Sequence, residues 1–181
     1  MIYCFLADGF EEIEALAPVD FLLSAGVDVK TVGVTGYFCR GAHGINVEAD
    51  ILLDDIQLNE SLQGIILPGG MPGAENLNNS EKVQEAIDYC AENNKIIGAI
   101  CAAPFIIGRK GLLNGKNATC FPGFENELLG ASVVESGVVT DGTIVTAKGA
   151  GVAWEFGAAI CSEIAGEEKS MEILRGIQWR K

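Results

Sequence analysis

Short, largely apolar runs that end at glycine-rich or small-residue turns constrain the fold of this chain most strongly. Three such runs occupy residues 2–6, 62–67 and 95–100. A run of this length without alternating polar positions is typical of a strand buried on both faces of a parallel sheet. Parallel strands need long crossover connections, which are usually helices. The runs therefore predict an α/β protein in which strands and helices alternate.

Helical signals lie between the runs. Three glutamates open the segment after residue 10, where carboxylates suit the positive end of a helix dipole, and Gly26 ends that segment. Further helices are expected at residues 80–93 and 151–165, with a last turn at 171–175. Further strands are expected at residues 27–34, 131–134, 138–139 and 143–147, and a short hairpin within 36–50. Residues 1–181 are thus expected to form one domain, with a mainly parallel sheet covered on both faces.

Charge and composition exclude several classes of function. Against 12 Lys and Arg residues stand 25 Asp and Glu residues, which gives a net charge of −13. We therefore expect no nucleic-acid partner, because phosphate binding needs clustered cations, and no membrane partner, because no apolar run approaches the roughly 20 residues that span a bilayer. The six cysteines form no Cys-x-x-Cys pair and there is one histidine, so we expect no metal centre. With no signal peptide near Met1, reduced thiols and a cytoplasmic location are expected.

Cys101 is the strongest candidate for a reactive residue. It follows the buried run directly, two alanines come next, and Pro104 stands where a first helical turn accepts proline. Such a strand-to-helix turn is a nucleophile elbow, which pushes the side chain into a cleft and lets helix amides favour a thiolate. A buried cysteine that merely ends a strand is the alternative.

Three other positions could take part in the chemistry. Gly69 and Gly70 follow another strand, and their amides could stabilise an oxyanion, although the glycines could also serve only a tight turn. Glu14 lies on an apolar helix surface near Pro18, so its pKa should be raised and its carboxyl group could donate a hydrogen bond to a thiolate. Glu11 and Glu12 are interpreted as complementing the dipole, and His43 as an exposed loop residue.

The motifs along nearly the whole chain resemble those of the ThiJ/PfpI superfamily, specifically the branch of the Parkinson-disease-associated cysteine deglycase and bacterial ThiJ-like proteins. They occupy residues 9–14 with 18–20, 67–70, 99–104, 119–123 and 154–156. The resemblance implies a flavodoxin-like three-layer sandwich, a homodimer and no cofactor. It also implies that Cys101 is the reactive cysteine beside a protonated Glu14, and that Gly70 and Ala102 supply oxyanion-stabilising amides.

Two departures from the family pattern narrow the function. Ala102 stands where the protease-like branch has histidine, so a peptidase is not expected, and Phe121 stands where the human-like branch has a histidine near the cleft. The loop of His43 aligns with a segment that approaches the partner's active site in family dimers, so His43 could act across a dimer interface.

The resemblance leaves two functions open. One is a cofactor-independent glyoxalase or deglycase that uses Cys101 on small 2-oxoaldehydes or their protein adducts. The other is a redox-responsive stress or chaperone protein in which Cys101 is oxidised and no dedicated substrate exists. Because the same cysteine serves both functions, the sequence does not separate them.

Overall fold

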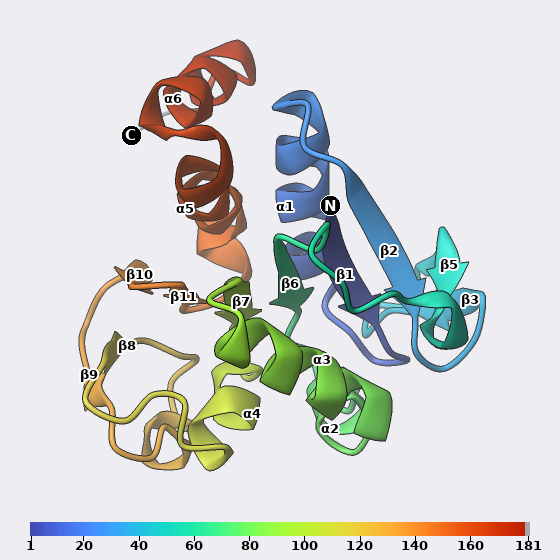
Figure 1. Cartoon of the computed structure of the whole chain (residues 1–181), viewed down its shortest axis with the longest axis horizontal. Coiled ribbons are helices and arrows are strands. Elements are labelled where there is room, and N and C mark those ends of the chain that lie inside the picture. Colours follow the sequence, from blue (N-terminus) through green and yellow to red (C-terminus); the bar gives the residue numbers. More distant parts are fainter. Residues whose placement is uncertain (180–181) are drawn as a thin grey trace.

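A seven-stranded sheet forms the middle layer of this computed structural model, which describes residues 1–179 (Figure 1). Its strand order is β10-β11-β7-β6-β1-β2-β5, and all neighbours run parallel except β10 and β11, which are antiparallel. The strands are β1 (Ile2–Leu6), β2 (Val29–Gly33), β5 (Ile51–Leu52), β6 (Gly64–Leu67), β7 (Ile96–Ile100), β10 (Val138–Asp141) and β11 (Ile144–Ala147). The mainly parallel sheet expected from the apolar runs is confirmed.

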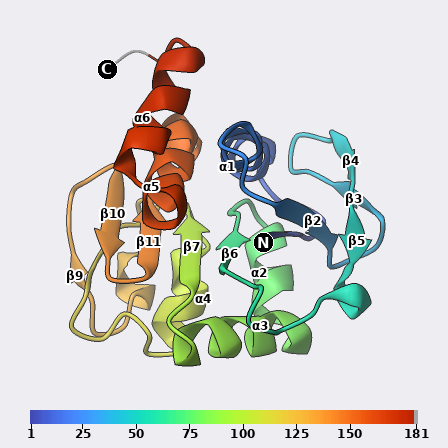
Figure 2. The same ribbon diagram turned by 45° about the horizontal axis from the view of Figure 1, so that its top comes forward.

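Helices cover both faces of the sheet, as the two views show (Figures 1 and 2). One apolar core lies between one face and α1, α5 and α6; the other lies between the opposite face and α2, α3 and α4. The helices are α1 (Glu12–Ser24), α2 (Gly73–Asn78), α3 (Glu81–Glu92), α4 (Pro104–Arg109), α5 (Ala153–Ala165) and α6 (Glu167–Gly176). Alternate residues of the central strands enter opposite cores, since successive side chains of a strand point to opposite faces.

Two small sheets lie beside the main one. The hairpin expected within residues 36–50 is formed by β3 (Phe38–Arg40) and β4 (Asn46–Glu48). The strand expected at 131–134 is shorter, β9 (Ser132–Val133), and it pairs with β8 (Asn117–Ala118) outside the main sheet. Short 3-10 turns occupy Leu53–Asp55, Glu125–Glu127 and Ala150–Val152.

The last helix is the clearest difference from expectation. A turn or two at residues 171–175 was expected, whereas α6 begins at Glu167. Its first residues are charged and lack apolar spacing, so the sequence pattern does not indicate a helix there. Packing against α5 supplies the support, because Leu174 is buried and the buried Ser170 hydroxyl donates to the carbonyl of Ala158 at 2.8 Å.

The register of the sheet brings three strand ends together. Leu67 at the end of β6 lies opposite Ala99 of β7, and Ile100 of β7 lies opposite Ala147 of β11. In open sheets of this kind, functional groups gather at the carboxyl ends of parallel strands. Within residues 1–179, no helix is both long and apolar enough to cross a membrane.

Candidate active site

Cys101 lies at a sharp turn between β7 and α4. Its amide still donates to Ala147 of the neighbouring strand at 2.8 Å, but its φ angle is 65°, in the left-handed region. A residue with a side chain adopts that region at a cost of about 1–3 kcal/mol, and such strained residues cluster at functional sites. Pro104 begins α4 two residues after Ala102 and loses no helical bond there. The side chain is partly exposed, as a nucleophile at an elbow must be.

Glu14 reaches the same strand ends from α1. The Glu11 side chain caps this helix by accepting a hydrogen bond from the Glu14 amide at 2.8 Å. The Glu14 side chain is 1% exposed, and its Oε2 accepts the amide of Gly69 at 3.0 Å. The Cys101 side chain and the Ala150 backbone lie close enough to lower the pKa of the same carboxyl group. The helix and the elbow therefore place a buried carboxyl group against the thiol.

The three predicted backbone donors divide into two roles. Amides of Gly70 and Ala102 hydrogen-bond the sulfur of Cys101, so they lie where charge develops on sulfur or on an adjacent oxygen. Gly69 was predicted with them, but its amide is committed to Glu14. A Cβ at Gly69 would lie 2.5 Å from Glu14 Oε2 and 2.6 Å from Cys101 Cβ. The absence of a side chain at Gly69 thus lets the carboxyl group and the thiol approach each other.

Burial raises the pKa of both acids. It raises the pKa of Glu14 to about 7, even though hydrogen bonds from Cys101, Gly69 and Ala150 work in the opposite direction. It raises the pKa of the Cys101 thiol to about 12, helped by the charge of Glu14 and against the amides of Ala102 and Gly70. The amides of Ala102 and Gly70 do favour the thiolate, but burial and Glu14 outweigh them. The thiol keeps its proton at neutral pH unless a neighbouring group accepts it, and Glu14 is the group in position.

An open hollow of about 440 Å³ adjoins this pair. Phe121 lines it, and the Phe121 amide donates to the carbonyl of Cys101 at 2.8 Å. Gly149 and Ala150 also line it; a Cβ at Gly149 would lie 3.8 Å from Glu14 Oε1, and Ala150 hydrogen-bonds the same carboxyl group. Sequence reasoning singled out neither Gly149 nor Ala150, because their importance comes from the end of β11 lying next to β7.

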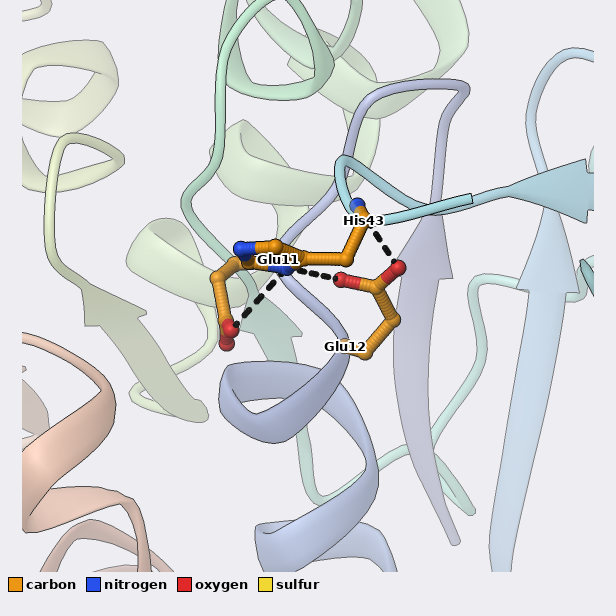
Figure 3. A group of neighbouring side chains, drawn as sticks. All are labelled: Glu11, Glu12 and His43. Carbon is orange, nitrogen blue, oxygen red and sulfur yellow. Dashed lines mark hydrogen bonds and ion pairs between the residues drawn. The ribbon is translucent and has the colours of Figure 1, made fainter. Parts of the chain in front are cut away.

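His43 lies on a loop after β3 and is held to α1. Its Nδ1 is 2.9 Å from Glu12 Oε2 and its amide donates to Glu12 Oε1 at 2.9 Å (Figure 3). The His43 side chain is 70% exposed, as expected, and the hydrogen bond to Glu12 raises its pKa. The structure does not bring His43 to Cys101 within one chain, so its action across a dimer interface stays a prediction.

Glu12 has a role that the sequence did not indicate. It was interpreted as a residue that complements the dipole, but it is buried and accepts backbone amides of His43 and Ile45. Burial raises the pKa of Glu12, but the hydrogen bond with the His43 side chain, together with the backbone hydrogen bonds, holds this pKa below its usual value. The distance along the chain hides this contact from sequence patterns.

Glu11, Glu12 and His43 also form the one group within residues 1–179 whose atoms could share a metal ion, all within 4.8 Å of one another (Figure 3). The Glu12 and Glu11 carboxylates already accept backbone amides, and the group lies at the positive end of α1, which disfavours a cation. These contacts show that the cluster serves to hold the loop of His43 against the start of α1.

The other five cysteines are buried, namely Cys4, Cys39, Cys90, Cys120 and Cys161. Burial raises the pKa of each of these thiols. Cys101 is therefore the accessible thiol among the cysteines of the chain.

Comparisons with known proteins identify the family of the chain. The profile of the DJ-1/PfpI family matches residues 1–163. Protein DJ-1 homolog B of Arabidopsis thaliana is 39% identical over 93% of this chain, and the chain spans 39% of that relative's length. Glutathione-independent glyoxalase DJR-1.2 of Caenorhabditis elegans is 29% identical over 91% of this chain and 88% of that protein.

A solved structure titled as oxidised DJ-1 of Toxoplasma gondii superposes with a TM-score of 0.94 and 30% identity, covering 99% of this chain and 98% of that one. The fold is thus the flavodoxin-like sandwich that the motifs implied. From the family match over most of its length and this agreement in structure, the chain belongs to the DJ-1/PfpI family.

Proposed function

We propose that this chain is a cysteine-dependent glyoxalase or deglycase that converts small 2-oxoaldehydes, or their adducts on proteins, without a cofactor. One observation carries the proposal: Cys101, held in a left-handed turn, and the buried carboxyl group of Glu14 lie against the same point of Gly69, where an added Cβ would be 2.6 Å from Cys101 Cβ and 2.5 Å from Glu14 Oε2. A nucleophile beside a group that can take and return its proton is what covalent catalysis at an aldehyde requires. The relative named as a glutathione-independent glyoxalase supports the same class.

The reaction begins when Glu14 accepts the thiol proton and the sulfur of Cys101 adds to the aldehyde carbon. A carbon–sulfur bond forms, the carbonyl electron pair moves to oxygen, and that oxygen takes the proton back from Glu14 to give a hemithioacetal. The amides of Gly70 and Ala102 stabilise the negative charge that develops on the way.

The second half is an internal redox reaction. Glu14 removes the proton from the former aldehyde carbon, which gives an enediol, and the neighbouring carbon is then protonated to give a thioester. Water hydrolyses the thioester, which releases a 2-hydroxy acid and restores the thiol. One carbon is oxidised and its neighbour is reduced, so no external oxidant takes part, and the need for a single acid–base group fits the presence of Glu14 at the thiol.

A second function is favoured by the structural relative whose title describes an oxidised protein. Here the sulfur of Cys101 attacks a peroxide, the oxygen–oxygen bond breaks, water leaves, and a sulfenic acid remains. A protonated Glu14 would donate a hydrogen bond to the oxidised sulfur. In this case the protein acts as a redox-responsive stress or chaperone protein and has no dedicated substrate.

A homodimer is part of the proposal. Ile13 and Leu16 expose apolar side chains on α1, and they line an open hollow together with Ala17, Asp20 and Trp154. A second copy of this chain would remove this apolar surface from water. His43, on the loop clasped to the start of the same helix, would then be able to meet the partner's site.

The two functions are separated by one comparison. Wild type, Cys101→Ser and Glu14→Ala are incubated with methylglyoxal in the absence of glutathione, and lactate is measured. The proposal expects lactate from wild type and a loss of at least about 100-fold in both variants. Absence of cysteine-dependent lactate, together with selective oxidation of Cys101 by dilute peroxide seen by intact mass, supports the redox function instead.

A further inference from the structure

The hollow beside the catalytic pair has a lining of two kinds. Phe121, Pro122 and Val152 give it apolar side chains, and the side chain of Phe121 is 47% exposed. Lys148 is the one charged residue among the described residues that line it. Cys101 and Glu14 lie next to this hollow and not in its lining, so the hollow offers apolar surface and one cationic residue to the part of a substrate that extends beyond the sulfur.

The position of Lys148 follows from the sheet. It is the first residue after β11, and the next residue, Gly149, adjoins the carboxyl group of Glu14. The Lys148 side chain is exposed, and within residues 1–179 its ammonium group has no carboxylate within 4.0 Å. The Lys148 ammonium group is therefore available to pair with an anion that enters the hollow.

Lys148 also borders a second hollow of about 270 Å³, which contains Glu125 and Glu135. The positive charge of Lys148 acts on the second hollow as well. It lowers the pKa of Cys120, whereas burial and Glu125 raise that pKa. Both carboxylates lie outside the lining of the hollow beside Glu14. On a chain with net charge −13, Lys148 thus brings a positive charge to the border between the two hollows.

We propose that Lys148 is a specificity-determining residue that selects 2-oxoaldehydes carrying an anionic group on an apolar body. The aldehyde carbon meets Cys101, the apolar body lies against Phe121 and Val152, and the anionic group pairs with the Lys148 ammonium. This inference rests on the proposed function for its reaction, but the binding preference itself does not require turnover.

Two aldehydes that differ in one charge test the proposal. Values of kcat/KM are measured for phenylglyoxal and for 4-carboxyphenylglyoxal with wild type, Lys148→Met, Lys148→Arg and, as a control, Lys169→Met on α6. The ratio of the carboxylated to the neutral substrate should fall by about threefold to fivefold in Lys148→Met, because an exposed ion pair is lost. Lys148→Arg should restore the ratio, and the control should leave it unchanged.

A second readout does not depend on turnover. Phenacyl bromide and 4-carboxyphenacyl bromide alkylate a thiolate, with a carbon–sulfur bond formed and bromide released, and intact mass gives the rate at Cys101. The same fall in the rate ratio is expected in Lys148→Met. If the wild-type protein turns over neither aldehyde but its alkylation ratio depends on Lys148, the glyoxalase proposal fails and this inference stands. If the alkylation ratio is the same in wild type and Lys148→Met, the inference is overturned, whatever the turnover shows.

Discussion

Glu14 is buried and Cys101 is partly exposed, and each of these two acids shifts the pKa of the other. Because burial disfavours charge on either group, the state in which both the thiol and the carboxyl group are ionised is unfavourable, and the pair keeps at least one proton. The sequence predicted both residues and the raised pKa of Glu14. It could not predict that the thiol is also held protonated, since this depends on how deeply the elbow lies beneath neighbouring strand ends.

The pH dependence of turnover tests the role of Glu14. In the wild-type protein, kcat/KM for methylglyoxal should rise as pH increases through about 7, because deprotonated Glu14 can then accept the thiol proton. Glu14→Gln should lose this step and fall by about 100-fold or more. A Gln variant that keeps the same step near pH 7 would assign the ionisation to another group.

Glu14 should also carry a stability cost. Its pKa is about 7 in the folded protein against an ordinary value of 4.5, so its stabilising proton is lost as pH rises through 7. Glu14→Gln should therefore be more stable than wild type at pH 8 by about 1–3 kcal/mol and nearly equal at pH 4. Urea denaturation at both pH values measures the difference, and equal stabilities at pH 8 would contradict the raised pKa.

Gly69 tests how closely the two acids must approach. A Cβ at Gly69 would lie 2.5 Å from Glu14 Oε2 and 2.9 Å from the carbonyl of Ile100, so Gly69→Ala should destabilise the protein by about 1–3 kcal/mol and reduce turnover. The matched control is Gly176→Ala on α6, where a Cβ meets nothing within 4 Å. Thermal unfolding of both variants measures the effect; similar melting temperatures would show that Glu14 can move away from Gly69.

At the scale of elements, the ends of β6, β7 and β11 and the start of α1 together build the site. The apolar runs predicted β1, β6 and β7 because strands buried on both faces need apolar residues at every position. The pairing of β9 was harder to predict. Its residue Val133 is apolar but exposed, so an apolar residue there does not distinguish pairing with β8 from pairing with the main sheet. The start of α6 was missed because contacts with α5, not its own apolar spacing, stabilise it.

The contact between α1 and α5 positions Glu14 and can be tested directly. A Cβ at Gly157 of α5 would lie 2.9 Å from Pro18 Cα and 3.1 Å from Phe21 Cβ on α1. Gly157→Ala should force the helices apart, destabilise the protein by about 1–3 kcal/mol and lower turnover by displacing Glu14. Chemical denaturation gives the stability change, and the neutral outcome of Gly176→Ala again serves as the reference. A Gly157→Ala protein with wild-type stability and turnover would contradict the tight contact.

At the scale of the whole molecule, the net charge of −13 opposes the formation of another anion in the site. In the proposed mechanism local groups must therefore stabilise the sulfur, and the amides of Gly70 and Ala102, which lower the pKa of the Cys101 thiol, are the candidates. The composition predicted that local groups must offset this charge, but the register of the sheet is needed to identify the amides that lie near the sulfur. Likewise, the sequence could not show that Lys148 lies beside the site, because β11 is far from β7 along the chain.

The proposed homodimer makes a prediction at this scale. Sedimentation velocity should give wild type a mass twice that of the chain, and Leu16→Glu should shift it toward the monomer, because a buried unpaired charge opposes association. Met171→Glu on α6 replaces an apolar residue of similar exposure, 43% against 36%, and should leave the dimer intact. A wild-type protein that sediments as a monomer would remove the dimer from the account, and His43 with it.

Covalent turnover at Cys101 is the central claim, and a time course by intact mass tests it most directly. Wild-type protein is mixed with a few equivalents of methylglyoxal without glutathione, and protein mass and lactate are followed together. We expect a transient adduct with the mass of one methylglyoxal on Cys101 that decays at the rate at which lactate appears, and no such adduct in Cys101→Ser. Lactate formed at the same rate by Cys101→Ser, or an adduct that persists while no lactate appears, would contradict it.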